Sequence, residues 1–315
     1  MGIKLLCTRD FGKKSISGIQ RLGYDIEVVE DDNLYYKDEF KDAEVLLCYD
    51  PFKTLDIGKM NKLKWIQLFS VGIDQAPKDD IRKKNIILTN NKGGYSIPMG
   101  EWIVLKILEM LKHSQKFYEK QKNKIWKMDT EILELWGKTV GFIGTGSIAK
   151  EAASRLKPFG VKILGLNTKG SDVEHFDKCF SLENVEDMLK LSDIVVVSIP
   201  YTKKTNHLVN ENLFKSMKNG VYIVNIARGS ILDEKALLEN IKNGKIAGAA
   251  LDVVENEPLD ESSPFWEFKN VTITPHNSWV SDQVDIRRFN MIYDNLKRYA
   301  SGGKLVNIVD INKGY

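Results

Sequence analysis

Cysteine is scarce in this sequence, and its scarcity argues against two kinds of protein. Only three cysteines, Cys7, Cys48 and Cys179, occur in 315 residues. Their number is odd and they lie far apart, which is not typical of a disulfide framework. They also lack the spacing of zinc ligands, so no metal site is predicted. This use of cysteine indicates the reducing environment of the cytoplasm.

The sequence also has no long apolar run and little net charge. Its apolar runs are far shorter than the ~20 residues of a transmembrane helix, so no membrane span is predicted. Residues 1–7 have neither the apolar stretch nor the cleavage site of a secretory signal. The 46 Lys and Arg against 43 Asp and Glu leave a formal net charge of +3, which does not favour a nucleic-acid partner. At ~100–200 residues per domain, we expect about two domains.

Short apolar segments alternate with amphipathic or polar ones in the first third of the chain. Helical patterns, such as 15–22 and 79–84, lie between segments rich in Val, Ile and Leu. Strands that alternate with helices form parallel βαβ units, so this region predicts a parallel α/β domain. Its predicted strands are residues 3–8, 26–29, 44–48, 65–69 and 86–89.

A second series of strands and helices begins at Thr139. Several of its apolar segments are continuous, as in strands that are covered on both faces. Asp233 is placed to cap the last helix of the series and Gly244 to end it. Six parallel strands with helices between them predict the doubly wound dinucleotide fold. The predicted strands are 140–144, 161–166, 194–199, 222–226, 248–253 and 271–274, and the helices are 147–156, 185–191, 211–217 and 234–243.

The last elements indicate that the two domains are nested. A helix at 282–299 and a short strand at 305–309 follow the second sheet, and we expect them to return to the first domain. The predicted architecture is therefore α/β with two doubly wound parallel-sheet domains, Rossmann-like or flavodoxin-like. Residues 96–285 form one domain, which is inserted into a discontinuous domain of residues 1–95 and 286–315.

A predicted helix at 99–111 is apolar on almost all sides. Such a helix is normally buried, and we expect it between the domains or at a subunit contact. Six lysines follow within residues 112–127. A binding patch is one interpretation of this run, but a solvated helix face is the more common explanation.

A glycine motif lies at the junction of the first strand and first helix of the second series. The residues Gly144-Thr145-Gly146-Ser147-Ile148-Ala149 match the pattern G-x-G-x-x-G/A. Gly144 and Gly146 allow a tight turn close to a pyrophosphate, and the helix N-terminus supplies N–H groups for it. The small Ala149 suits close packing of helix and strand. The motif predicts a dinucleotide site.

The residue after the next strand bears on the choice between NAD and NADP. An acidic residue at this place binds the ribose 2′-hydroxyl of NAD and repels a 2′-phosphate. The chain instead has Asn167, Thr168 and Lys169. Asn167 has no charge, Thr168 can donate a hydrogen bond and Lys169 is positive. We therefore predict that NADPH is accepted or preferred, while the alternative that Lys169 is only a surface residue and NADH works equally well stays open.

Polar residues follow three later strands of the same series. Arg228 lies in the segment 225–229, Asp252 and Glu257 in 252–258, and His276 in 274–278. Ligands of open α/β sheets bind outside the carboxyl ends of the strands. An arginine, a glutamate and a histidine are therefore predicted to meet in one crevice.

With these motifs, the chain resembles the D-isomer-specific 2-hydroxyacid dehydrogenase family over essentially its whole length, and within it the glyoxylate/hydroxypyruvate reductases. The catalytic arginine, glutamate and histidine of the family match Arg228, Glu257 and His276. The stretch 70–74 matches the substrate-binding loop, which implies substrate contacts at Val71 and Gly72 in addition to Arg228 and His276.

The resemblance also implies the cofactor, the substrate and the assembly. It implies an NAD(P)-dependent enzyme that acts on small 2-oxo and 2-hydroxy acids as a homodimer, with NAD(P) bound by residues 96–285 and substrate by the other domain. Pro200 and Thr205 match a pattern beside the nicotinamide, and Asp252 is expected at its carboxamide. The expected cofactor contacts are Gly144, Thr145, Gly146, Ser147, Ile148, Asn167, Thr168, Lys169, Pro200, Thr205, Ile226, Ala227, Asp252 and Asn277.

The chemistry of these residue types supports the implied roles. The planar guanidinium of Arg228 can pair with a substrate carboxylate while another N–H polarises the neighbouring ketone oxygen. Imidazole titrates near neutral pH, so His276 is suited to protonate the alkoxide that develops as hydride arrives. Glu257, if hydrogen-bonded to the other ring nitrogen, would orient the imidazole and favour its charged form.

Other interpretations of the same residues stay open at this point. A nicotinamide-sensing regulatory protein, similar to corepressors with this fold, would keep the cofactor site but show negligible turnover. A methyltransferase is a weaker alternative, because a glycine-rich loop also suits an adenosyl cofactor. The remaining histidines, His113, His175 and His207, are interpreted as structural or surface residues. Glyoxylate, hydroxypyruvate, pyruvate and bulkier 2-oxo acids all suit Arg228 equally well.

Overall fold

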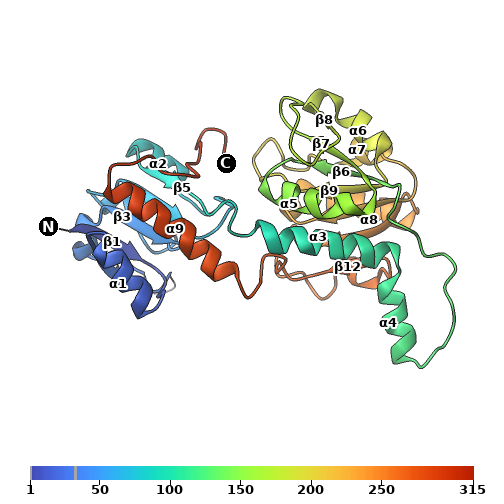
Figure 1. Ribbon diagram of the computed structural model, residues 1–315, viewed down its shortest axis with the longest axis horizontal. Helices are drawn as coiled ribbons and strands as arrows, with labels where there is room; N and C mark the ends of the chain where they lie inside the picture. The colour runs from blue at the N-terminus through green and yellow to red at the C-terminus, as the bar shows by residue number, and fades with distance from the viewer. Residues whose placement is uncertain (1, 32–33) are drawn as a thin grey trace. The chain divides into compact units, whose positions relative to one another are not determined.

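The computed structural model describes residues 2–31 and 34–315, which form two compact units (Figure 1). Unit 1 comprises Met1–Tyr95 and Ser281–Tyr315, and unit 2 comprises Ser96–Val280. The predicted return of the chain at residue 286 lies inside helix α9 (Val284–Ala300), so this boundary was wrong by five residues. The boundary precedes the helix because α9 packs as one element on unit 1, where Ile292 and Leu296 are fully buried.

In the described residues of unit 1, five parallel strands form one sheet in the order β2-β1-β3-β4-β5. This is the flavodoxin-like order, with a switch point between β1 and β3. The strands are β1 (Ile3–Cys7), β2 (Tyr24–Val28), β3 (Val45–Cys48), β4 (Trp65–Leu68) and β5 (Ile87–Thr89). The helices are α1 (Lys13–Arg21), α2 (Lys78–Lys83) and α9.

Neighbouring residues of each unit 1 strand enter two different hydrophobic clusters. Leu5 of β1 packs with Ile19 of α1 and with Ile292 of α9. Leu6, the next residue, packs on the opposite face with Ile81 of α2. Side chains alternate across a strand, so a sheet that is covered on both faces needs apolar residues at consecutive positions.

Unit 2, described over its whole length, contains a seven-stranded parallel sheet in the order β12-β11-β10-β9-β6-β7-β8. The order reverses at β6, so the switch point lies between β6 and β9. The strands are β6 (Thr139–Ile143), β7 (Lys162–Leu166), β8 (Lys178–Phe180), β9 (Ile194–Val197), β10 (Val221–Asn225), β11 (Ile246–Leu251) and β12 (Val271–Ile273). The helices are α3 (Ser96–Leu111), α4 (Ser114–Lys122), α5 (Ser147–Leu156), α6 (Val185–Leu191), α7 (Glu211–Ser216) and α8 (Glu234–Lys242).

Helices cover both faces of the unit 2 sheet. Val140 and Phe142 pack with residues of α3 and α5 on one face, and Ile143 packs with α6, α7 and α8 on the other. The apolar helix α3 thus finds its main partner, α5, inside its own unit. The prediction of two doubly wound parallel α/β domains, one inserted into the other, is confirmed.

Two predicted details were wrong. The sequence predicted six strands in the second sheet, but β8 is a seventh, at its edge. It is only three residues long and begins with a lysine, so its apolar signal is weak. The predicted strand 305–309 forms no strand but a single bridge between Ile308 and Thr89. Asn307 has a φ of 57°, which interrupts the extended backbone.

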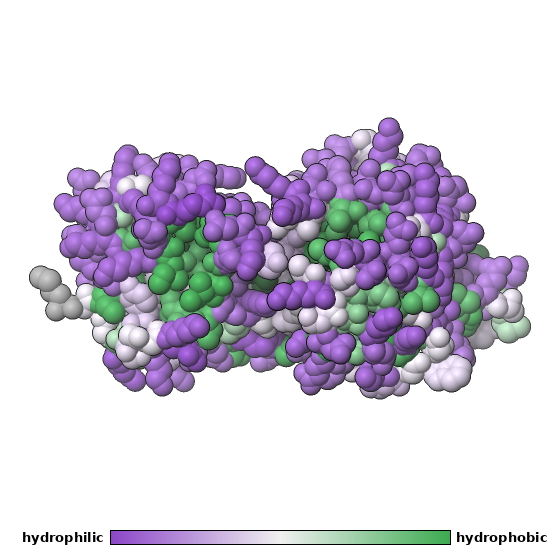
Figure 2. Space-filling view, turned by 90° about the horizontal axis from the view of Figure 1, so that it is seen from above, coloured by the Kyte–Doolittle hydropathy of each residue, from purple (hydrophilic) through white to green (hydrophobic). Residues whose placement is uncertain are grey.

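The predicted ends of α8 and the solvated face of α4 are confirmed. Asp233 caps α8 by accepting a hydrogen bond from the Ala236 N–H, and Gly244 follows the helix with a φ of 76°. The nine residues of α4 contain no buried side chain, in agreement with a solvated lysine-rich face. Hydrophilic side chains cover most of the face drawn in Figure 2, where hydrophobic ones form separate patches. No helix among the described residues has the length and apolar character needed to cross a membrane.

Candidate active site

The glycine loop between β6 and α5 combines one position that is closely packed with one that is open. Gly144 has a φ of 105°, and a Cβ there would lie 2.7 Å from Cγ2 of Ile199, so only glycine fits. A Cβ on Gly146 would meet nothing within 4 Å. Helix α5 then begins at Ser147 without a side-chain cap, and Ala149 is fully buried. Open space before uncapped N–H groups fits a pyrophosphate.

This loop lies at the switch point of the sheet. Gly144 follows β6 and contacts Ser198 and Ile199, which follow β9. Strands β6 and β9 are paired in parallel, so both loops leave the same edge. Ligands of doubly wound sheets bind at this place. The residues present therefore fit a dinucleotide.

The turn after β7 contains Asn167, Thr168 and Lys169. The Asn167 amide oxygen accepts hydrogen bonds from the N–H groups of Lys169 at 3.2 Å and Ser171 at 3.1 Å. Its amide nitrogen donates to the Ser171 carbonyl at 2.8 Å. Asn167 thus shapes its own turn, while the side chains of Thr168 and Lys169 are exposed. The turn offers a cation and no carboxylate to a ligand.

Pro200 and Thr205 belong to one turn after β9. The Thr205 hydroxyl donates to the Pro200 carbonyl at 2.9 Å and accepts from the Thr202 N–H at 2.7 Å. These bonds close the turn. Contact of these residues with a nicotinamide stays a prediction.

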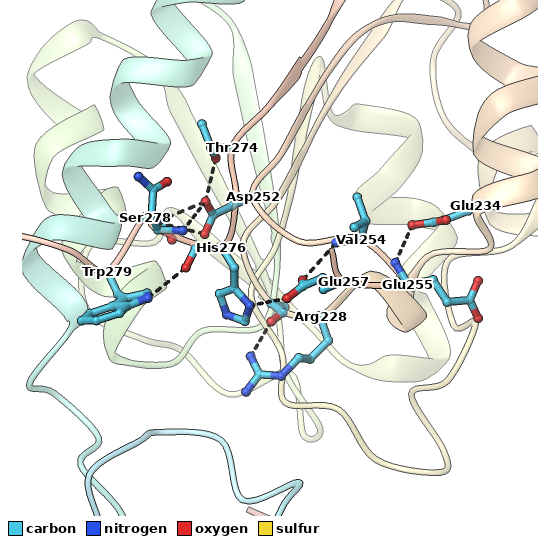
Figure 3. A network of polar contacts seen from close by, with 12 residues as sticks. Arg228, Glu234, Asp252, Val254, Glu255, Glu257, Thr274, His276, Ser278 and Trp279 are labelled. Atoms are coloured by element: carbon cyan, nitrogen blue, oxygen red, sulfur yellow. Dashed lines mark hydrogen bonds and ion pairs between the residues drawn. The ribbon is translucent and has the colours of Figure 1, made fainter. Parts of the chain in front are cut away.

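His276 and Glu257 form a hydrogen-bonded pair beyond the ends of β12 and β11 (Figure 3). His276 Nδ1 lies 2.8 Å from Glu257 Oε2, and the two side chains are 39% and 38% exposed. The other carboxylate oxygen, Oε1, accepts from the Val254 N–H at 3.3 Å. Because Glu257 engages Nδ1, proton exchange with a ligand falls to Nε2.

Asp252, which follows β11, organises the segment that carries His276. Asp252 is only 1% exposed, and its carboxylate accepts hydrogen bonds from the Thr274 hydroxyl at 2.6 Å and from the Asn277 and Ser278 N–H groups at 3.1 Å. The Asp252 carbonyl accepts from the His276 N–H at 2.8 Å. Asp252 therefore ties the segments after β11 and β12 together. The expected contact of Asp252 with a carboxamide stays a prediction.

Arg228 lies three residues beyond β10, after Ile226 and Ala227. The buried Asn225 side chain donates to the Arg228 carbonyl at 3.1 Å and accepts from the Ala227 N–H at 3.1 Å, which shapes the strand end. Arg228 Nη1 donates to the Ala227 carbonyl at 2.7 Å. Figure 3 shows Arg228, Glu257 and His276 pointing into one region. Next to Arg228, a Cβ on Gly229 would lie 1.9 Å from the carbonyl carbon of Val254, so the two segments are in direct contact.

Val71 and Gly72 belong to unit 1, in the loop after β4. Asn90 donates to the Val71 carbonyl at 2.8 Å, and the Ser70 hydroxyl donates to the Gly72 carbonyl at 2.7 Å. These bonds define the loop, whose N–H groups are predicted to bind a carboxylate. The structure brings His276 and Glu257 into contact, with Arg228 beside them, whereas the part of Val71 and Gly72 stays a prediction.

Sequence reasoning missed the residues that hold the site in place. Thr274 and Ser278 hold Asp252, and Glu234 of α8 accepts a hydrogen bond from the Glu255 N–H at 2.6 Å. A carboxylate in the first turn of a helix is common, because the partial positive charge at the helix N-terminus stabilises it. Glu234 therefore carries no sequence signal that connects it to Glu255.

Comparisons with known proteins agree with this arrangement. Residues 104–278 match the model of the NAD binding domain of D-isomer specific 2-hydroxyacid dehydrogenases. A glyoxylate reductase of Thermofilum pendens is 35% identical over 270 residues, which are 83% of this chain and 79% of that protein.

Solved structures give the same result. A D-isomer specific 2-hydroxyacid dehydrogenase from Xanthobacter autotrophicus Py2, in complex with NADPH, has a TM-score of 0.85 at 26% identity, with full coverage of both chains. A D-lactate dehydrogenase from Aquifex aeolicus, complexed with NAD and lactic acid, has a TM-score of 0.78 at 28% identity. This second alignment covers 95% of this chain and 96% of the Aquifex protein.

Proposed function

Because the chain belongs to the D-isomer specific 2-hydroxyacid dehydrogenase family, we propose that it reduces small 2-oxo acids to D-2-hydroxy acids, with Arg228, Glu257 and His276 as its catalytic residues. The family makes it an NAD(P)-dependent oxidoreductase of 2-hydroxy acids. The observation that carries the finer proposal is the 2.8 Å contact of His276 Nδ1 with Glu257 Oε2, at the strand edge that also bears Arg228.

The three side chains have different roles in the reduction of a 2-oxo acid. The guanidinium of Arg228 pairs with the substrate carboxylate, and a further N–H polarises the ketone oxygen. A nicotinamide bound at the glycine loop would supply the hydride. His276 Nε2 donates a proton to the oxygen of the former ketone, and Glu257 stabilises the imidazolium before the transfer. In the reverse direction, the neutral imidazole accepts the hydroxyl proton.

For the cofactor, we propose that NADPH is accepted or preferred. The support is local: the turn 167–171 carries Lys169 and no carboxylate, and its Asn167 amide is engaged within the turn. A phosphate on the 2′-position would meet a cation and no anion there. The two related structures described above contain NADPH in one case and NAD in the other.

The alternative of a nicotinamide-sensing regulatory protein is not favoured. The relatives reported above are named as enzymes. A sensor would also have little need for the imidazole–carboxylate pair that His276 and Glu257 form.

We also propose a homodimer, in which unit 2 provides the contact. The segment between α4 and β6 exposes large apolar side chains, among them Trp126 at 104%, Met128 at 84% and Trp136 at 74%. Asp129 anchors this segment, since its carboxylate lies 2.6 Å from Lys116 Nζ and 3.2 Å from His113 Nδ1. The contact with Lys116 lowers the pKa of Asp129 well below its usual range. An anchored segment with exposed apolar side chains suits a protein contact.

A substrate panel tests the proposed activity. Glyoxylate, hydroxypyruvate, pyruvate and a bulkier 2-oxo acid are each mixed with NADPH or NADH, and the loss of nicotinamide absorbance is followed. We expect turnover with at least one acid, and its absence with all of them would contradict the proposed activity. A tenfold advantage of NADH over NADPH would contradict the cofactor proposal alone.

A further inference from the structure

A second imidazole–carboxylate contact lies next to the pair of His276 and Glu257. Nε2 of His207 lies 3.0 Å from Oε1 of Glu255, two residues before Glu257. The N–H of Glu255 donates to Oε1 of Glu234 at 2.6 Å. These residues come from three segments: the turn after β9, the first turn of α8 and the loop after β11.

The backbone of Val254 and Glu255 is held from three directions. The N–H of Glu255 is bound by Glu234. One residue earlier, the Val254 N–H binds Glu257 Oε1 at 3.3 Å. Gly229 packs against the peptide so closely that a Cβ would lie 1.9 Å from the Val254 carbonyl carbon and 2.1 Å from the Glu255 nitrogen. Figure 3 shows this peptide between Glu234 and Glu257. A shift of this backbone would therefore move the Val254 N–H, which binds Oε1 of Glu257.

His207 connects the side chain of Glu255 to two other parts of the site. Its side chain binds Glu255, and its N–H donates to the Ser230 carbonyl at 2.8 Å, two residues beyond Arg228. It also lies two residues after Thr205, in the region predicted to contact the nicotinamide. His207 thus joins the segments that carry Arg228, Glu257 and the cofactor turn.

The charged groups of the cluster act on one another. Burial raises the pKa of Glu234; the hydrogen bond from the Glu255 N–H lowers it in part, the negative charge of Glu255 raises it, and His207 lowers it. Among residues 2–31 and 34–315, no group of three His, Cys, Asp or Glu side chains has an arrangement that would hold a metal ion.

We propose that Glu234, Glu255 and His207 are positioning residues that align Glu257 with His276. They touch no reacting atom in the proposed reaction. Glu234 binds the N–H of Glu255, and His207 binds the carboxylate of Glu255, which together hold the backbone of residues 254–255. The N–H of Val254 in this backbone binds Oε1 of Glu257, and Oε2 of Glu257 then meets His276 Nδ1. This inference rests on the proposed function, and it assigns a task to His207, which sequence reasoning treated as a structural or surface residue.

Glu234→Ala and Glu234→Gln test the proposal in the full-length protein. The alanine variant loses the acceptor for the Glu255 N–H, so we expect kcat to fall by about 10- to 100-fold, with little change in the KM of the 2-oxo acid. The glutamine variant keeps an oxygen acceptor and should retain most of kcat. The matched control is Glu211→Ala, which removes a different carboxylate bound to α8, at 2.8 Å from Asn240, and should leave kcat unchanged.

A measurement that needs no turnover separates this inference from the proposed function. The NMR titration of the His276 imidazole, assigned with His276→Asn, should have its midpoint at lower pH in Glu234→Ala than in the wild type, because a misaligned Glu257 stabilises the imidazolium less. An unchanged midpoint would overturn the inference, whether or not the wild type turns over. Inactivity of the wild type with every 2-oxo acid would instead overturn the proposed function.

A second variant covers the case in which Glu234→Ala does not fold. His207→Leu removes the contact with Glu255 from the other side, and we expect the same downward movement of the His276 midpoint. Thermal unfolding and NADPH fluorescence show whether each variant is folded. A folded His207→Leu protein with the wild-type midpoint and kcat would also count against the cluster.

Discussion

Glu257 Oε2 lies 2.8 Å from Nδ1 of His276, although the two residues are 19 positions apart in the chain. They meet because β11 and β12 are parallel neighbours whose carboxyl ends share one edge. The carboxylate of Asp252 at the end of β11 then holds the segment 274–278. The contact is thus a consequence of the sheet, and it determines which ring nitrogen of His276 can face a substrate.

Replacement of His276 by asparagine should abolish most turnover and leave cofactor binding intact. Asparagine cannot exchange a proton near neutral pH, so we expect kcat to fall by about 100- to 10,000-fold. Steady-state kinetics with the best 2-oxo acid and NADPH fluorescence titration measure the two effects. Near wild-type turnover in His276→Asn would contradict the assignment.

Replacement of Glu257 by glutamine should change both the rate and its pH dependence. The neutral amide stabilises the imidazolium less, so we expect kcat to fall by about 100-fold and the rate of reduction to decline at a lower pH than in the wild type. The pH profile of kcat/KM measures this. Glu261→Gln, a change at an exposed carboxylate of the same region, is the control. Identical profiles for Glu257→Gln and the wild type would exclude an orienting role.

The two glycines of the phosphate loop should respond differently to alanine. Gly144→Ala places a Cβ 2.7 Å from Ile199 in a backbone with a φ of 105°, so it should destabilise the fold by about 1–3 kcal/mol. Gly146→Ala meets no protein atom within 4 Å and should fold normally. Its added methyl group would instead occupy the space of the pyrophosphate and raise the Kd of the cofactor by at least about tenfold. Thermal unfolding and fluorescence titration separate the two effects, and normal cofactor affinity in Gly146→Ala would argue against this location.

Removal of the Lys169 charge should weaken NADPH binding selectively. Lys169→Ala loses the cation proposed to meet the 2′-phosphate, so we expect the KM of NADPH to rise about 3- to 10-fold while the KM of NADH is unchanged. The control is Lys190→Ala, which removes an exposed lysine of α6 that pairs with Glu186. Equal effects of Lys169→Ala on both cofactors would show that the residue does not distinguish them.

Substitution of the exposed aromatic side chain Trp126 should disrupt the proposed dimer. The double variant Trp126→Ser, Met128→Ser removes apolar area from the segment between α4 and β6, and we expect the mass in solution to fall from that of two chains to that of one. Light scattering after size-exclusion chromatography measures the mass. Ile286→Ser, a change at an apolar residue that is 56% exposed in unit 1, should leave the dimer intact. A wild type that is monomeric at all concentrations would refute the proposal.

Local patterns were sufficient to predict most of the fold. Consecutive apolar residues, as in β9 and β10, are required by a sheet covered on both faces, and the turn at Gly144 requires a glycine whatever the rest of the chain does. The edge strand β8 escaped prediction because only two of its three residues are buried. The segment 305–309 was wrongly predicted as a strand because of its apolar residues. The positive φ of Asn307 interrupts the extended backbone there.

Local sequence patterns were enough to predict the two parallel sheets and the types of residue at their strand ends, because alternation of strands and helices is a local property of the chain. The same patterns show that an arginine, a glutamate and a histidine follow successive strands of one sheet. Which atoms meet depends on the folded structure, as for Nδ1 of His276 with Oε2 of Glu257, or the Glu255 N–H with Glu234, 21 positions away. Hydrogen bonds extend only about 3 Å, so they depend on where packing places each loop, and no spacing in the sequence encodes that position.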